Sequence, residues 1–234
     1  MGYKVINLKD IYSNIGEKET KSTLNNFECA LNKDVEYFIK EKAIEFSKQD
    51  IAETFLVMTS YKKEDVIVGY FSFATKVVRV KRNTLTGKKK KRFSRFSEYD
   101  EENKCHYIPL PLIGQLGKNY KNEYNKLISG DILLKLACEK IKEAQDILGG
   151  RFIFLECEDK PKLKEFYESN GFVCFGKRNL EKDEREKNSG EYLLQMLCDL
   201  SNIWYILRTN HSSFSFRQIS HDKTKTKSYN KNSK

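Results

Sequence analysis

The segment from Asn125 to Asp131 has a pattern that could bind a phosphate group. It is a polar loop that leads into an amphipathic helix, so its backbone N–H groups would lie at the start of that helix. Unpaired N–H groups and the helix dipole both favour negative charge at such a position. Backbone amides donate whatever the side chain is, although Ile128 does not easily take a positive φ angle. The pattern predicts either a phosphate-binding loop or an ordinary strand–helix connection.

The phenol of Tyr167 could donate a proton. A phenol is protonated at neutral pH and can hydrogen-bond to sulfur. Tyr167 also follows Phe166 and lies near Phe172, so the alternative is a helix aromatic that packs in the core.

Two carboxylates, Glu156 and Glu158, flank Cys157 at the predicted end of a strand. They could accept a proton from an amine, but most such carboxylates are solvated or paired. No histidine accompanies Cys157 in this pattern, which argues against a nucleophilic cysteine. The sequence therefore leaves the general base unassigned.

Hydrophobic periodicity predicts the elements that must position these residues. Strands are predicted over 54–61, 66–74 with a continuation through 80, 107–117, 151–156, 172–176 and 192–198. Helices are predicted over 33–48 and 130–148, and after Asp159, which could cap a helix that tolerates Pro161 and stops at Gly171. Residues 1–26 show no clear period.

The order strand, loop, helix, strand and then a helix ending in Phe166-Tyr167-Glu-Ser-Asn-Gly171-Phe172 resembles the core of the GNAT N-acetyltransferases. Roughly residues 25–198 share the resemblance, which is nearest to GNAT-type toxins of toxin–antitoxin pairs. The matching upstream segments are 27–31, the helix from Lys33, 54–57, 68–72 and 108–117. The chain departs from the family at Asn125, where Gln or Arg is usual, and at Ile128, where Gly is usual. Gln115 stands where the toxins often have Arg.

This resemblance implies an α/β (α+β) fold with a single mixed, mostly antiparallel central sheet flanked by helices. It implies an acyltransferase that moves an acetyl group from acetyl-CoA to a primary amine by direct attack in a ternary complex, with Tyr167 as the acid. In the family, the central strand pairs its backbone with the pantetheine arm, and the loop holds the pyrophosphate. The residues that match these cofactor-binding positions are Leu116, Lys118, Ile128, Ser129, Gly130 and Asp131.

The toxin subgroup implies aminoacyl-tRNA as the acceptor and an antitoxin protein as a partner. The sequence itself leaves the acceptor amine open. The alternative is a non-catalytic protein of the same fold that binds RNA or a protein partner through residues 79–95.

Positive charge is concentrated in two segments of this chain, whose net charge is +10. Residues 201–234 contribute +6, and this basic, low-complexity tail is expected to be disordered. Residues 79–106 are expected to be an insertion in a GNAT-like domain over 1–200. Nine Lys or Arg and no acid occupy residues 79–97, which predicts either a solvated loop or hairpin insertion, or a contact for phosphate groups.

Composition excludes several other classes of protein. No apolar stretch is long enough to span a membrane, and the first residues have no export signal, so a cytoplasmic location is expected. The six cysteines form no C-x-x-C pair and are interpreted as reduced core thiols. With a single histidine, His106, in the body of the chain, no metal site is predicted.

Overall fold

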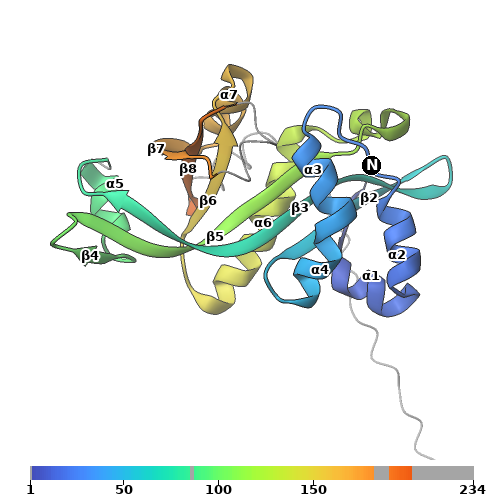
Figure 1. Ribbon diagram of the computed structural model, residues 1–234, viewed down its shortest axis with the longest axis horizontal. Coiled ribbons are helices and arrows are strands. Elements are labelled where there is room, and N and C mark those ends of the chain that lie inside the picture. Colours follow the sequence, from blue (N-terminus) through green and yellow to red (C-terminus); the bar gives the residue numbers. More distant parts are fainter. Residues whose placement is uncertain (1, 85–86, 182–189, 202–234) are drawn as a thin grey trace, which may run out of the picture.

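One mixed sheet of eight strands runs through the described part of the chain, which comprises residues 2–84, 87–181 and 190–201 of the computed structural model (Figure 1). The strands are β1 (Lys4–Asn7), β2 (Glu53–Tyr61), β3 (Glu64–Lys81), β4 (Glu98–Asp100), β5 (Cys105–Lys118), β6 (Phe152–Glu158), β7 (Val173–Asn179) and β8 (Tyr192–Asp199). The helices are α1 (Leu8–Ile15), α2 (Glu17–Leu24), α3 (Lys33–Tyr37), the π-helix η1 (Phe38–Lys42), α4 (Ala43–Lys48), α5 (Gly87–Phe93), the 3₁₀-helix η2 (Lys121–Leu127), α6 (Gly130–Leu148) and α7 (Pro161–Ser169).

Neighbouring strands follow the order β1-β2-β3-β5-β6-β8-β7, and β4 pairs with the start of β5. Every pair is antiparallel except β5 with β6, which is parallel. The sheet is therefore mixed and mostly antiparallel, as the sequence predicted.

Helices cover both faces of this sheet. Helices α6 and α7 pack on one face, where Leu133, Ala137 and Tyr167 join the largest core cluster. Helices α1 to α4 cover the other face over β2 and β3, around Tyr70. Val78 lies eight positions after Tyr70 on β3, so the two side chains share one face of the sheet. Val78 packs there in a cluster with Phe93 of α5. By this alternation, α1–α4 and α5 lie over the same face of β3, and Figure 1 shows them at opposite ends of the sheet.

The N-terminal segment was not predicted and holds three elements, β1, α1 and α2. These elements are only four to eight residues long, so each shows too little periodicity to stand out in the sequence. Asn7 caps α1 by accepting a hydrogen bond from the Lys9 N–H at 2.8 Å. Leu8 and Leu24 are fully buried, so this segment belongs to the core beneath α3 and α4.

Close approach of α3 to β5 depends on Gly117. A Cβ atom at this position would lie 2.3 Å from Cγ1 of Val35, and backbone or side chain would have to move. The missing side chain therefore lets the N-terminal helices pack directly on the strand that lies at the centre of the candidate site.

The structure corrects the predicted start of α7. Its N-cap is Lys160, which makes no capping side-chain hydrogen bond, and Pro161 occupies the first turn. Asp159 instead accepts a hydrogen bond from the Tyr192 hydroxyl at 2.6 Å, so a contact with β8 takes the place of the predicted cap.

The described residues of the segment 79–106, which leave out 85–86, form a hairpin with its own helix rather than a solvated loop. Strands β3 and β5 stay paired as far as Lys81 and Cys105. Helix α5 and strand β4 lie between these two residues in the sequence, and β4 pairs with the start of β5. Phe93 of α5 is buried against Phe152, with ring centroids 5.5 Å apart. We call residues 79–106 the hairpin lobe. It lies at the end of the sheet that is opposite to α1–α4 in Figure 1.

Three further observations concern the classes of protein considered above. None of the helices in the described ranges is long and apolar enough to cross a membrane. The same ranges contain no group of three or more His, Cys, Asp or Glu side chains that could hold a metal ion. All six cysteines are free, and five of them are buried, as predicted for core thiols. The predicted tail, residues 201–234, lies outside the described residues except for Ser201.

Candidate active site

Strands β5 and β6 separate near the centre of the sheet and leave a notch between them. Their pairing is limited to Leu112 with Phe154 and Ile113 with Leu155. Beyond this point, β5 continues to Lys118 paired with β3, and β6 continues to Glu158 paired with β8. The edges of β5 and β6 that face each other there have no strand partner among the described residues. We call this gap, between 114–118 and 156–158, the notch.

Unpaired strand edges carry backbone N–H and C=O groups that can bind an extended ligand. Leu116 and Lys118, the residues predicted to bind the pantetheine arm, both lie on the open stretch of β5. A linear chain with amide groups could pair with this edge as an additional strand would. The predicted residues are therefore in a position to do what the resemblance implied.

The loop between β5 and α6 is held in place by the side chain of Lys118. Its Nζ donates hydrogen bonds to the carbonyl oxygens of Asn125, at 3.1 Å, and Ile128, at 3.3 Å. The Tyr3 hydroxyl also donates to the Leu127 carbonyl, at 2.7 Å. Sequence reasoning assigned Lys118 a backbone role only, and no motif indicated that its ammonium group would organise this loop.

Ile128 and Ser129 determine how α6 begins. Ile128 has an extended backbone, with φ −142°, and its side chain is 2% exposed in the core. The positive φ angle that β-branched residues disfavour is therefore not required. The Oγ of Ser129 accepts a hydrogen bond from the Ile132 N–H at 3.1 Å, which caps the helix. This contact uses one of the amides that could otherwise bind an anion.

Gly130 and Asp131 form the first turn of α6, beside α7. A Cβ atom on Gly130 would lie 3.1 Å from the Phe166 ring, so α7 packs against this turn. Asp131 accepts a hydrogen bond from Nδ2 of Asn170 at 2.8 Å. The two contacts join the start of α6 to the helix that carries Tyr167.

Tyr167 lies on α7 between Phe166 and Phe172, with ring centroids 5.0 and 5.7 Å away. Its side chain shares a core cluster with Cys157 on the open stretch of β6 and is 8% exposed. Burial raises the pKa of Tyr167 above its ordinary value. No described residue forms a hydrogen bond with its hydroxyl. The phenol is thus protonated, and its donor is not engaged elsewhere in the protein.

Neither strand-end carboxylate is prepared to act as a base. Glu156 receives hydrogen bonds from Nε of Arg178 at 2.9 Å and Nζ of Lys76 at 3.0 Å. Burial alone would raise the pKa of Glu156, but these two cations lower it below the ordinary value. Glu158 pairs with Lys160 at 2.6 Å. The alternative of paired carboxylates is therefore the arrangement that the structure shows.

The thiol of Cys157 is also unsuited to carry an acyl group. Burial raises its pKa to about 12, so the reactive thiolate is scarce at neutral pH. This agrees with the interpretation of Cys157 as a core thiol.

Comparison with solved structures places this arrangement in a known fold, although no protein-family model and no curated protein matches the sequence. AtaT complexed with acetyl-methionyl-tRNAfMet has a TM-score of 0.58 and 16% identity, over 88% of this chain and 99% of that one. A tyrosine-to-phenylalanine mutant of KacT has a TM-score of 0.58 and 14% identity, over the same shares. AtaTR bound with AcCoA has a TM-score of 0.52 and 15% identity, over 88% and 98%. The fold is GNAT-like. The neighbours are GNAT-type toxins, in agreement with the resemblance seen in the sequence.

One residue of this GNAT-like fold supports the site and was missed by sequence reasoning. Asn119, directly after β5, is 1% exposed, and its Nδ2 donates to the Ile67 carbonyl at 2.8 Å. Its Oδ1 accepts from the N–H groups of Glu28, at 3.0 Å, and Lys121, at 3.1 Å. Asn119 thereby fixes the end of β5 and the start of η2. An asparagine in a polar loop gives no sequence signal for this role.

Proposed function

We propose that this chain is an N-acetyltransferase that transfers an acetyl group from acetyl-CoA to a primary amine by direct attack in a ternary complex. The observation that carries the proposal is the notch between β5 and β6, with the start of α6 and the unengaged phenol of Tyr167 beside it. A neighbour with this fold, AtaTR, was solved with AcCoA. Cytoplasmic acetyl-CoA would be the donor, and the proposal involves no metal.

The proposed donor site has two parts. The open edge of β5, with Leu116 and Lys118, binds the pantetheine arm through backbone hydrogen bonds. The loop from Ile128 to Asp131 receives the pyrophosphate at the start of α6, where the backbone N–H groups of Gly130 and Asp131 lie outside the helical ladder. Lys118 adds a positive charge beneath that loop through its contacts with two carbonyl oxygens.

Tyr167 assists the departure of the thiol. The amine nitrogen attacks the thioester carbon, a C–N bond forms, the C–S bond breaks, and the proton lost by nitrogen ends on sulfur. A phenol of pKa ~10 gives its proton to a thiolate of pKa ~8.5 at a cost of about 2 kcal/mol. Burial raises the pKa of Tyr167 and so increases that cost. Tyr167 therefore acts chiefly as a hydrogen-bond donor to the departing sulfur, and full transfer follows with solvent.

We assign no residue as the general base. Glu156 is held by Arg178 and Lys76, and proton uptake there would break both ion pairs. The amine is therefore proposed to enter already deprotonated or to lose its proton to water.

The proposed acceptor is the amino group of an aminoacyl-tRNA. This step rests on the neighbour AtaT, which was solved with acetyl-methionyl-tRNAfMet. An antitoxin is the proposed protein partner, because AtaT was also solved bound to the C-terminus of the antitoxin AtaR. A non-catalytic protein that binds RNA or a protein partner is the alternative.

Calorimetric titration with acetyl-CoA tests the donor site. The wild-type protein is expected to show a saturable site, and Gly130→Asp is expected to weaken it strongly, because a carboxylate would face the pyrophosphate. Gly130→Ala is the matched control, since both variants place a Cβ against Phe166 but only one adds charge. Absence of binding to folded wild-type protein would contradict the enzyme proposal and favour the non-catalytic alternative.

A further inference from the structure

The hairpin lobe has a net positive charge, whereas the rest of the body has a net negative charge. Residues 79–106 contain ten Lys or Arg and four Asp or Glu, a net charge of +6. Residues 1–200 together carry only +4, so the body without the lobe is net negative. The net positive charge of residues 1–200 therefore comes from the hairpin lobe.

The cations of the lobe differ from those of the body in how they are paired. Fourteen lysines outside the lobe form ion pairs with an acid, for example Lys4 with Asp65 at 2.7 Å and Lys21 with Glu41 at 3.7 Å. Within the described residues, the lobe has a single ion pair, made by Arg92. The lobe cations without an ion pair to a described residue include Arg82, Lys90, Lys91, Arg95 and Lys104.

The acids of the lobe do not neutralise these cations by contact. Asp100 accepts hydrogen bonds from the backbone and side chain of Asn103, at 2.9 and 2.8 Å, within its own turn. His106 adds no charge, because burial and the neighbouring charges of Lys90 and Arg82 lower its pKa. The lobe therefore keeps a high density of unneutralised positive charge.

An aromatic cluster packs the lobe against the sheet. Phe93 and Phe96 contact the Phe152 ring, with centroids 5.5 and 5.8 Å apart. Tyr99 packs on His106, with centroids 4.8 Å apart. Contacts of this kind place α5 and β4 in a fixed orientation, unlike a free basic loop.

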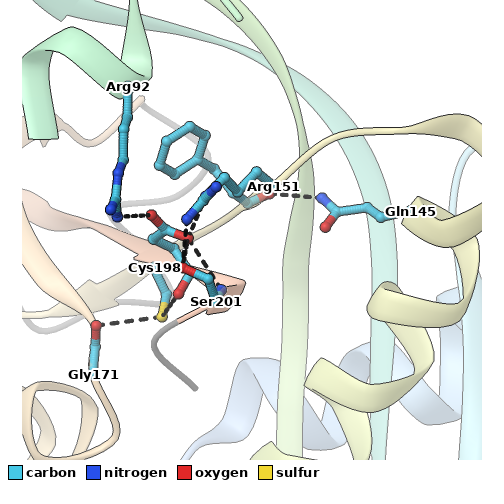
Figure 2. Close-up of polar contacts among 8 residues, drawn as sticks. Arg92, Gln145, Arg151, Gly171, Cys198 and Ser201 are labelled. Atoms are coloured by element: carbon cyan, nitrogen blue, oxygen red, sulfur yellow. Dashed lines mark hydrogen bonds and ion pairs between the residues drawn. The ribbon is translucent and has the colours of Figure 1, made fainter. Parts of the chain in front are cut away.

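Asp199 connects the lobe to the body. Figure 2 shows the side chains of its partners Arg92, Arg151 and Ser201 lying close together. The Asp199 carboxylate accepts a hydrogen bond from Nε of Arg151 at 2.8 Å and pairs with Arg92 of α5 at 3.3 Å. The Ser201 hydroxyl donates to the same carboxylate at 2.8 Å. Arg92 therefore anchors α5, and the neighbouring cations Lys90, Lys91 and Arg95 are left to face solvent or a ligand.

The position of the lobe suits a large acceptor. Ile113, where the notch begins, lies eight positions after Cys105 of the lobe on β5, a distance of about 25 Å along a strand. An amine bound in the notch would reach the lobe only as part of a long molecule. Charge without matching acids favours a polyanion.

We infer that the hairpin lobe, with Lys90, Lys91 and Arg95 foremost, is a binding surface for the phosphate backbone of an RNA whose reactive end enters the notch. The inference rests on the proposed function for the identity of the acceptor. It assigns the lobe the role of increasing affinity for the RNA, and it leaves the chemistry to the notch.

The test is the salt dependence of binding to labelled total tRNA by the full-length protein. The variant Lys90→Ser/Lys91→Ser/Arg95→Ser removes three lobe charges. The matched control Lys4→Ser/Lys21→Ser/Lys48→Ser removes three exposed charges that are paired in the body, so both proteins keep the same net charge and the same tail. Over about 50 to 300 mM KCl, the log–log slope of the lobe variant is expected to fall by about 2 units, with a 10- to 100-fold weaker affinity near physiological salt. The control is expected to match the wild type.

Two companion measurements make each outcome decisive. Thermal melting confirms that both variants are folded, and acetyl-CoA titration reports on the notch separately. Equal slopes for the lobe variant and the control would overturn the inference. The same result is expected if the lobe binds an acidic protein instead of RNA. A changed slope in a protein that does not bind acetyl-CoA would support the lobe as an RNA surface and contradict the proposed enzyme function.

Discussion

The notch and the hairpin lobe occupy the two ends of β5 and differ in which groups they leave unpaired. At the notch, the side chains of Lys118 and Glu156 are engaged with the protein, and the backbone of β5 is open on one edge. In the lobe, β5 pairs with both β3 and β4, and the side-chain cations are open. Backbone groups are directional and suit one small ligand, whereas clustered cations attract any polyanion. Under the proposed function, the notch would recognise the acetyl donor and the lobe would bind the acceptor.

Removal of the Tyr167 hydroxyl should have the largest predicted effect, and this effect should be limited to turnover at the notch. Tyr167→Phe keeps the ring contacts with Phe166 and Phe172 but removes the hydrogen-bond donor. Turnover is expected to fall roughly 10²–10⁴-fold, with acetyl-CoA affinity and tRNA affinity nearly unchanged. Steady-state kinetics with aminoacyl-tRNA and calorimetry measure these quantities. Tyr12→Phe on α1 makes the same chemical change at a remote position, and unchanged turnover in both variants would return Tyr167 to a packing role.

Loss of the Asp199 charge should loosen the lobe and leave the notch intact. The Asp199 carboxylate is mostly buried and contacts two arginines, so Asp199→Asn is expected to lower the free energy of unfolding by about 2 kcal/mol. Amide hydrogen exchange in α5 should accelerate more than exchange in α7. Asp146→Asn breaks an exposed pair with Lys142 on α6 and should cost less than about 0.5 kcal/mol. Equal losses in the two variants would contradict the role of Asp199 as an anchor.

Replacement of Lys118 tests whether its side chain organises the loop before α6, the proposed pyrophosphate site. Lys118→Met keeps the aliphatic chain but removes both hydrogen bonds to the loop carbonyls. Acetyl-CoA affinity is expected to fall about 5- to 10-fold, equivalent to roughly 1 kcal/mol. Lys121→Met removes a nearby exposed ammonium that contacts Asn26, and it should have little effect. If the two variants bind acetyl-CoA equally well, the side chain of Lys118 does not position the loop.

The smallest predicted effect is a difference between the wild type and Glu156→Gln in how much the free energy of unfolding falls at acid pH. The pKa of Glu156 is lowered in the folded state, so its contribution to stability is complete above its unfolded pKa of about 4.3 and is lost as pH falls through the folded value. Glu156→Gln should therefore lose less unfolding free energy than the wild type between neutral pH and pH ~3. Chemical denaturation at several pH values measures this. Glu143→Gln, on exposed α6 surface, should follow the wild type, and parallel curves for all three proteins would show that Glu156 does not contribute.

Long periodic segments were predictable, and short ones were not. The strand over 107–117 and the helix over 130–148 match β5 and α6 within two residues, because each spans several periods. Elements β1, α1 and α2 were missed because they are short. Strand β1 is held by pairing with β2, and α1 and α2 by burial of Leu8 and Leu24 in the core with α3. Helix α5 was also missed, since five consecutive cations carry no apolar period. The buried ring of Phe93 and the ion pair of Arg92 with Asp199 hold it against the sheet.

For the candidate site, sequence reasoning located the backbone positions and missed the side chains that support them. Leu116 and Gly130 lie where the motif placed them, at the notch and at the start of α6. The Lys118 ammonium donates a hydrogen bond to a carbonyl of the loop before α6. The Asn119 amide donates to the carbonyl of Ile67, which is distant in the sequence. Hydrogen bonds of this kind depend on where the chain returns in space, and no local pattern encodes them.

By itself, the sequence determined the order of the long elements, the start of α6 at Gly130 and the placement of Tyr167 on the helix after β6. It could do so because apolar periodicity and helix-starting residues act over a few neighbouring positions. Only the tertiary structure decided that β5 separates from β6 after two residue pairs and that Glu156 is engaged by two cations. It also decided that the basic run is a helix anchored through Asp199. These features depend on contacts between residues that are tens of positions apart, and such contacts form only when the whole sheet is assembled.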